Sequence, residues 1–337
     1  MTATALPCLA ETRATAALAG LAVGDALGMP AQTLPRGVIR ERYGRITGLV
    51  APFDGHPISH GLRAGQVTDD TEQTLLLARR LIAEPQGFDD AGWARDLLEW
   101  EAGIRAKGLA DLLGPSSKAA IEALLAGAPP DETGRRGTTN GAAMRIAPVG
   151  IATPPDVAQI PARVARTCRV THNTGEAIAA ASAVAMVVSA GVAGQGFDAA
   201  LDPALAAARA GQALGNAVGE PDVAARIALA LEIAETGDEE QLLAAIGSSV
   251  ASRESVPMAF GLLRLARGDL WRALLSAANI GDDTDTIGAI AGAMGGATGC
   301  PLPDTVVAEV TETSGLDLAP VARALLTLRQ GDTPCPG

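Results

Sequence analysis

Apolar residues recur along this chain in alanine- and leucine-rich runs, separated by short segments rich in Gly, Pro, Thr and Asp. The runs at 12–27, 89–106, 257–266 and 318–329 each cover at least two helical turns, and we predict helices there. Residues 31–67 hold several Gly and Pro and little periodicity, which predicts a long loop. Hydrophobic residues make up 48% of the chain and aromatics only 2%, so small aliphatic side chains must fill the core. Such a core favours closely packed helices, and we predict an all-α protein.

One uncharged segment, residues 177–197, meets the length threshold for a membrane-spanning helix. Ala, Ser and Gly dominate it, and their preference for membrane insertion is weak compared with that of Leu-rich spans. We therefore predict a buried helix of a soluble protein and no membrane partner. Residues 14–24 resemble the apolar part of a signal peptide but lead directly into Asp25, so we assign them to the fold.

The length of 337 residues would allow two domains, yet no Pro/Gly/Ser-rich linker or charge boundary divides the chain. We predict a single domain over 1–337, with its core at about 14–330 and frayed ends.

Charge and cysteine content narrow the functional classes. The formal net charge is −12, and no stripe of Lys or Arg appears, so a nucleic acid partner is disfavoured. The cysteines are widely scattered and form no C-x-x-C motif, which predicts neither a zinc site nor a disulfide framework. A reducing cytoplasm is the simplest location for Cys8, Cys168, Cys300 and Cys335.

Two acidic clusters stand beside predicted helices. Residues 279–296 place Asp282, Asp283 and Asp285 among threonines, directly before an apolar, glycine-studded segment. Residues 68–72 form a second cluster, T-D-D-T-E, before another amphipathic run. Carboxylates that enter a core need cations, N–H donors or a metal ion as partners.

Helix capping is the simpler account of both clusters. On this account, Asp69 is the N-cap residue of one helix and Glu72 completes its capping box. Asp283, Asp285 and Thr286 would cap the second helix in nearly the same way. A cap uses only one oxygen, however, whereas the two clusters together supply enough oxygens for two hard cations. We therefore favour a metal site.

Two further segments are candidates for ligand binding. Residues 133–148 are dense in Gly, Thr and Asn and flanked by Arg135, Arg136 and Arg145, so they form either an anion cradle or a plain surface turn. His172 precedes the long uncharged helix, which Thr171 or Asn173 would cap, and is either a structural hydrogen-bonding group or part of a site.

These motifs together resemble the ADP-ribosylglycohydrolase family. The resemblance covers about residues 14–300 and implies an orthogonal bundle of many α-helices with two magnesium or manganese ions in a central cleft. It further implies hydrolysis of a glycosidic bond at the anomeric carbon of ribose. The motifs, in the family's order, are G-D-A-L-G-M-P at 24–30, T-D-D-T at 68–71, N-G-A-A-M-R at 140–145, T-H at 171–172, S-V-P at 255–257 and G-D-D-T-D-T at 281–286.

The resemblance implies roles for individual residues. Asp282 stands where many relatives have glycine and is not counted as a ligand. Asp69, Asp70 and Asp283 would be catalytic, and Asp69 or Asp70 would accept a proton from water. The two Mg²⁺ or Mn²⁺ ions would be held by Thr68, Asp69, Asp70, Asp283, Asp285 and Thr286. The substrate would be bound by Gln32, Ser116, Ser117, Gly137, Thr138, Thr139, Asn140, Gly141 and His172.

Two positions depart from many relatives. Gln32 replaces a glutamate that serves some members, and an amide cannot act as a general base. Thr138 stands where relatives that grip adenine often have an aromatic residue, and the nearest rings along the chain belong to Tyr43 and Phe53.

Three functions remain open from the sequence. The first is a metal-dependent hydrolase that releases ADP-ribose from a modified protein. The second is a di-metal hydrolase of a smaller N-riboside or nucleotide-like metabolite. The third is a non-catalytic ADP-ribose-binding protein, which the intact carboxylates disfavour.

Overall fold

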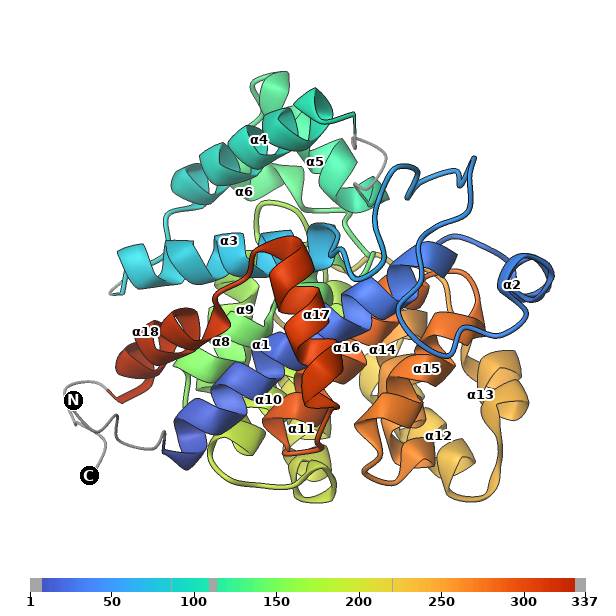
Figure 1. The fold of residues 1–337 in the computed structure, drawn as a ribbon. Coiled ribbons are helices and arrows are strands. Elements are labelled where there is room, and N and C mark those ends of the chain that lie inside the picture. Colours follow the sequence, from blue (N-terminus) through green and yellow to red (C-terminus); the bar gives the residue numbers. More distant parts are fainter. Residues whose placement is uncertain (1–7, 86, 109–113, 220, 331–337) are drawn as a thin grey trace, which may run out of the picture.

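Helices α1 (Leu9–Gly28) and α16 (Thr284–Ala297) lie side by side through the middle of the molecule (Figure 1). The computed structural model describes residues 8–85, 87–108, 114–219 and 221–330, so Cys335 and the C-terminal tail lie outside the described residues. Within those ranges the chain forms eighteen α-helices, one 3-10 turn and no named strand. The prediction of an all-α bundle is confirmed.

Glycine lets α1 and α16 approach until their backbones touch. A Cβ atom built on Gly24 would lie 2.0 Å from the carbonyl oxygen of Gly288, and one on Gly20 would lie 2.2 Å from that of Gly292. No side chain fits in these gaps, because real Cβ contacts at such distances do not occur. The close approach brings Asp25 of α1 next to the N-terminal turn of α16.

Helix α10 (Gly175–Val192) is the other core element. All of its residues are buried, and Thr174 caps it through the backbone N–H of Ala177, so the expectation that Thr171 or Asn173 would cap it was wrong. Two helices of the described residues are long and apolar enough to cross a membrane, and both are packed inside the fold: 89% of the apolar span in α1 is buried, and 100% of that in α10. They are therefore core helices, as predicted for 177–197, although α10 ends at Val192 and residues 193–196 are exposed.

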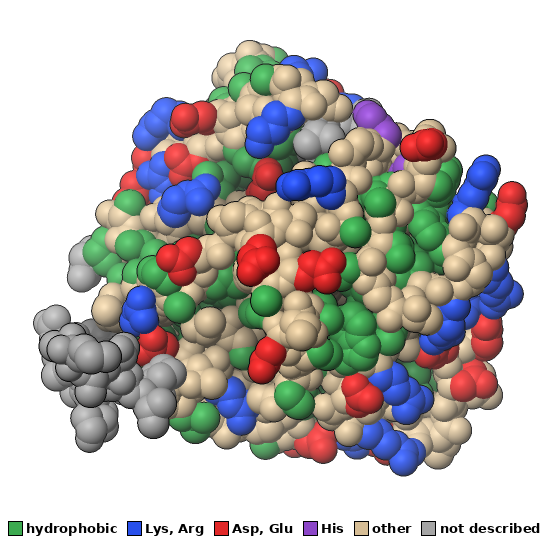
Figure 2. All heavy atoms as spheres, in the orientation of Figure 1, with side chains coloured by type: hydrophobic (Ala, Val, Ile, Leu, Met, Phe, Trp, Pro, Cys, Tyr) green, Lys and Arg blue, Asp and Glu red, His purple; other side chains and the backbone are tan. Residues whose placement is uncertain are grey.

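The remaining helices surround this core. In Figure 1, α4, α5 and α6 form a layer above α3, and α12 to α15 cover the opposite side. On the face shown in Figure 2, acidic and basic side chains are interspersed and no basic stripe crosses it. The bounds are α2 Arg36–Tyr43, α3 Asp69–Ala83, α4 Asp90–Ala106, α5 Pro115–Leu125, α6 Pro130–Thr133, α7 Gly141–Met144, α8 Ala147–Ala152, α9 Gln159–Cys168, α11 Phe197–Gln212, α12 Val223–Thr236, α13 Glu239–Ile246, α14 Ser252–Ala266, α15 Leu270–Ile280, α17 Asp304–Ser314 and α18 Leu318–Gln330, with the 3-10 turn at Met29–Ala31.

Two predicted boundaries need correction. The segment 31–67 contains the two-turn helix α2, although the rest of it is irregular as predicted. Helix α14 begins at Ser252, before the proline that was predicted to start it. Pro257 has no N–H for the carbonyl of Arg253, four residues earlier, which accepts a hydrogen bond from the Arg226 side chain instead.

Candidate metal centre

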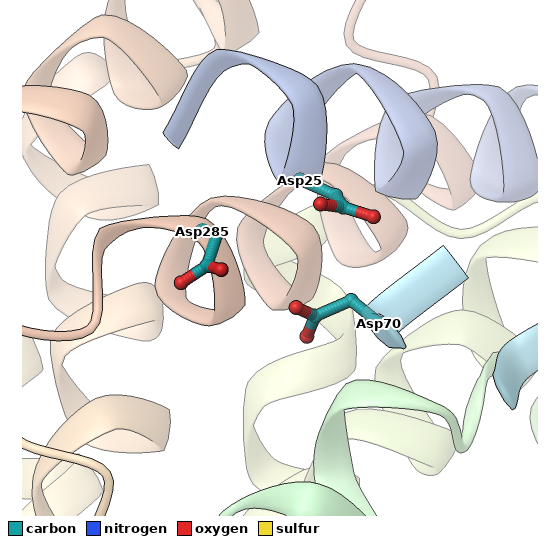
Figure 3. A group of neighbouring side chains, drawn as sticks. All are labelled: Asp25, Asp70 and Asp285. Carbon is teal, nitrogen blue, oxygen red and sulfur yellow. The ribbon is translucent and has the colours of Figure 1, made fainter. Parts of the chain in front are cut away.

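Three carboxylates from three helices converge at the centre of the fold. Asp25 comes from α1, Asp70 from the first turn of α3 and Asp285 from the first turn of α16, and one oxygen of each lies within 4.8 Å of the others (Figure 3). All three residues are buried. One oxygen of Asp70 and one of Asp285, both Oδ1, have no hydrogen-bond partner among the described residues. Buried oxygens of this kind are suited to coordinate a cation.

Asp69 and Asp283 enlarge the acidic group. Both line a small cavity of about 40 Å³. The other residues around that cavity include Gln32, Ser117, Thr139, Asn140, Gly141, Asp285 and Thr286. Five buried carboxylates thus lie at or beside one cavity.

Asp25 holds the second acidic cluster in place. Its Oδ1 accepts a hydrogen bond from the Thr68 hydroxyl (2.8 Å), and its Oδ2 accepts from the Thr71 hydroxyl (2.5 Å). The backbone N–H groups of the same two threonines also donate to Asp25, at 3.0 and 3.1 Å. The first turn of α3 is therefore capped by a side chain from another helix.

The capping account of the acidic clusters is wrong for α3. Its N-cap residue is Thr68 rather than Asp69, and Thr68 makes no side-chain cap bond. Glu72 forms no capping box, because its carboxylate accepts a hydrogen bond from the Trp100 indole N–H at 2.7 Å. The carboxylates of Asp69 and Asp70 are left for another role.

Capping also fails to account for the cluster on α16. Asp283 occupies the N-cap position but makes no side-chain cap bond. It accepts a hydrogen bond from the Asn140 amide, which also donates to the Ser255 hydroxyl at 2.9 Å.

Burial raises the pKa of every carboxyl in the group. Desolvation raises the pKa of Asp25 and of Asp283 to about 6 from the ordinary value of 3.8. Desolvation, followed by the charges of neighbouring aspartates, raises the pKa of Asp69, Asp70 and Asp285 well above it. Among the described residues no Lys or Arg pairs with any of the five within 4.0 Å. Hard divalent cations would supply the missing positive charge, and the donor set of carboxylate and hydroxyl oxygens fits them.

The two predicted threonine ligands lie at this centre. The Thr68 hydroxyl is 3.3 Å and the Thr286 hydroxyl 3.4 Å from Asp70 Oδ2. Asp25 was missed by the sequence analysis, although the motif that contains it was recognised. The signal that marks it is that Asp25 is the one charged residue in the otherwise Ala/Gly-rich stretch 14–28 of α1.

The predicted substrate loop forms one wall of the cavity. Thr139, Asn140 and Gly141 line it, and the backbone N–H of Asn140 donates to the carbonyl of Val250 at 2.9 Å. Thr138 holds the loop from outside the cavity, because its carbonyl accepts from the Ser252 N–H at 3.0 Å. Gly137 packs on the backbone of Thr171, where a Cβ atom would lie 2.1 Å from the carbonyl oxygen.

The remaining predicted substrate residues divide into lining and supporting groups. Ser117 and Gln32 line the cavity, whereas the Ser116 hydroxyl accepts from the Thr139 N–H at 3.4 Å. His172 is fully buried, with its Nε2 3.1 Å from the Thr139 hydroxyl. Arg145, which was predicted to flank an anion cradle, points inward and is buried.

The two aromatic side chains considered for stacking on adenine, Tyr43 and Phe53, pack against each other. The rings of Tyr43 and Phe53 lie 6.1 Å apart, and Phe53 and His56 lie 5.3 Å apart. The Arg42 guanidinium covers Phe53 at 4.7 Å from the ring centre. None of these rings lines the cavity described above.

Comparisons with known proteins identify the family to which this helical fold belongs. Residues 9–335 match the family described as ADP-ribosylglycohydrolase. The chain is 36% identical over 323 residues to the uncharacterized protein YegU of Escherichia coli (strain K12), covering 93% of this chain and 96% of the relative. It is 28% identical over 311 residues to the ADP-ribosylarginine hydrolase Tri1 of Pseudomonas putida (strain GB-1), covering 87% of this chain and 72% of the relative. The solved structure of an ADP-ribosylglycohydrolase-related protein complex is similar at a TM-score of 0.67 and 26% identity, over 95% of this chain and 98% of that one. The chain belongs to the ADP-ribosylglycohydrolase family, and it is a hydrolytic enzyme.

Proposed function

We propose that this enzyme is a metal-dependent hydrolase that cleaves the glycosidic bond of ADP-ribosylated substrates and releases ADP-ribose. The observation that carries the proposal is the pair of unpartnered oxygens on Asp70 and Asp285 within a buried carboxylate group, next to the Thr139–Gly141 wall. A purely structural cluster would have these oxygens hydrogen-bonded.

Two Mg²⁺ or Mn²⁺ ions would be held at this centre. Such ions act as Lewis acids that orient ribose hydroxyls and make water a better nucleophile near neutral pH. Asp25 joins the ligand set as a direct ligand or as the anchor of Thr68. The proposed ligands are otherwise those expected from the motifs, Thr68, Asp69, Asp70, Asp283, Asp285 and Thr286.

The chain's own side chains would then orient the substrate and move the proton. Asp69 and Asp283 both face the cavity, and a carboxylate there accepts the proton of the attacking water. Negative charge beside the anomeric carbon stabilises an oxocarbenium-like transition state. Asn140 donates to Asp283, which fixes the direction of that carboxylate.

The acceptor from which ADP-ribose is removed is proposed to be a modified protein side chain. A relative at 28% identity is named as an ADP-ribosylarginine hydrolase, which makes arginine the first acceptor to test. A smaller N-riboside or nucleotide-like metabolite is the second candidate. The observation that favours it is that Tyr43 and Phe53 pack on each other and do not line the cavity, so adenine has no ring there to stack on.

A substrate panel tests the proposal. Purified enzyme is incubated with ADP-ribosyl-arginine protein, ADP-ribosyl-serine protein and simple ribosides, each with Mg²⁺, Mn²⁺ or chelator. We expect ADP-ribose release that needs a divalent ion, and an Asp283→Asn variant that folds but loses metal binding and turnover. Turnover that survives complete removal of metal would contradict the metal dependence. Hydrolysis of ribosides alone would favour the second candidate.

A further inference from the structure

Arg145 is a buried cation that has no ion-pair partner in the described part of the chain. The residue is 1% exposed, and its guanidinium faces the Trp93 ring at 5.6 Å from the ring centre. One terminal nitrogen, Nη1, donates to the Gln73 side-chain carbonyl, and the other, Nη2, donates to the Thr171 hydroxyl at 2.5 Å. A guanidinium can only donate hydrogen bonds, so both partners must accept.

The first arm of this network leads to the acidic centre. Because the Gln73 carbonyl accepts from Arg145, its amide nitrogen points the other way. That nitrogen lies 3.3 Å from Asp69 Oδ2 and donates to it. Arg145 thus fixes the orientation of the Gln73 amide. As a result, Oδ2 of Asp69 accepts a hydrogen bond from Gln73.

The second arm leads to the wall of the cavity. The Thr171 hydroxyl accepts from Arg145 and lies 2.8 Å from His172 Nδ1, so it can donate its own proton to that nitrogen. Arg145 Nη2 also faces His172 Nδ1, at 3.5 Å. A proton on Nδ1 would oppose the guanidinium and leave the Thr171 proton without an acceptor. The network therefore assigns the ring proton to Nε2.

The His172 Nε2–H group then sets the direction of the last bond. It donates to the Thr139 hydroxyl at 3.1 Å. Thr139 lines the cavity, and its hydroxyl has no other hydrogen-bond partner among the described residues. Its proton is consequently free to point into the cavity.

We propose that Arg145 is a positioning residue that fixes the hydrogen-bond direction of both arms, so that Gln73 donates to Asp69 and Thr139 donates to the bound ligand. The site would then take a ligand that presents an acceptor oxygen to Thr139, such as a phosphate or a ribose oxygen. This last step rests on the proposed function, whereas the direction of the bonds within the protein does not.

The ring proton of His172 is tested directly by ¹⁵N NMR of histidine-labelled protein without metal or substrate. The chain has three histidines, so the His172 signals are assigned by their loss in a His172→Gln variant. We expect the Nε2–H tautomer in the native protein. Arg145→Met removes the guanidinium that faces Nδ1 but keeps a long side chain, and it should shift the tautomer toward Nδ1–H. A native His172 with its proton on Nδ1 would overturn the proposal.

Two further variants separate positioning from packing. Arg145→Lys keeps a positive charge that can only donate hydrogen bonds, and it should keep the native tautomer. Thr167→Val is the matched control, because Thr167 is a buried threonine of α9 whose hydroxyl donates to the Val164 carbonyl at 2.9 Å, outside the network. An equal change of tautomer in Thr167→Val would show a general packing effect and would contradict the proposal.

Kinetics on the substrate found in the panel test the ligand contact. Arg145→Met should raise KM about tenfold, the effect of losing one hydrogen bond. The Arg145→Lys and Thr167→Val variants should keep the native KM. An unchanged KM in Arg145→Met would refute the contact between Thr139 and the ligand. If no substrate is turned over, the proposed function fails while the NMR measurement still decides the direction of the network.

Discussion

Asp25 acts on the site through the residues that it holds. Four donors from Thr68 and Thr71 converge on its two oxygens, and the same carboxylate lies beside Asp70 and Asp285. One side chain therefore fixes the start of α3 and contributes negative charge to the centre. An amide at this position would offer only one accepting atom to the four donors.

Asp25→Asn is expected to weaken divalent-ion binding by about ten- to a hundred-fold, the usual effect of losing a ligand or its support. The shift of thermal unfolding with Mg²⁺ or Mn²⁺ concentration measures this. Asp282→Asn is the matched control, because Asp282 is exposed and has a positive φ of 56°, which asparagine tolerates. An Asp25→Asn protein that keeps the native metal response would remove Asp25 from the centre.

Residue types alone predicted that the two acidic clusters would lie together. The density of carboxylates at 68–70 and 283–285 exceeded what caps need, and those residues do lie together. Asp25 and Arg145 were harder because their roles come from partners far along the chain. Asp25 contacts Thr68, 43 residues away, and Arg145 contacts Gln73, 72 residues away. Only folding brings such partners together.

Among the helices, the pair α1 and α16 determines the geometry of the centre. Gly20 packs on Gly292 and Gly24 packs on Gly288, backbone against backbone. No flexible side chain lies between them that could move to make room for an added Cβ atom. The separation of Asp25 and Asp285 is fixed by the same contact. Packing between these helices is therefore linked to the proposed metal binding.

Gly24→Ala is expected to destabilise the protein by about 3 kcal/mol or more, since overpacked cores usually lose 1–3 kcal/mol and here only backbone lies opposite. Urea unfolding measures the loss, and metal affinity should fall with it. Gly103→Ala is the control, because Gly103 lies in α4 with nothing within 4 Å of a new Cβ atom. That variant should gain about 0.5–1 kcal/mol. Equal changes in the free energy of unfolding for the two substitutions would show that the close approach of α1 and α16 does not contribute to stability.

Helix positions were predicted best where the apolar pattern was long. The predictions at 12–27 and 318–329 fall within α1 and α18. Helix α2 was missed because it is short, polar and buries only Ile39. Its helical form is selected by contacts with the rest of the fold rather than by its own periodicity.

Across the whole molecule, folding collects five carboxylates that would repel one another in the absence of a cation. Each has a folded-state pKa above its ordinary value, so the folded protein holds these protons to higher pH than the unfolded chain does. The resulting stability is complete below the ordinary value of 3.8 and is lost as pH rises through the folded-state values, which begin at about 6.

Metal-free protein is therefore expected to lose stability as pH rises from about 4 through 6 and above. The rise of the Asp25 pKa from 3.8 to about 6 alone corresponds to roughly 3 kcal/mol. Denaturant unfolding at several pH values measures the decline, and saturating Mg²⁺ should abolish most of it. Metal-free protein whose stability rises over this range would contradict the electrostatic account.

The pairing of α1 with α16 also has a consequence for synthesis. Residues 29–283 separate the two helices, and a ribosome needs roughly ten seconds to a minute to add them. During that time α1, an apolar helix that is synthesised before α16, has no partner for the glycine face that later contacts α16. We expect nascent chains of this protein to depend on a chaperone such as a ribosome-associated holdase until the last third of the sequence has emerged.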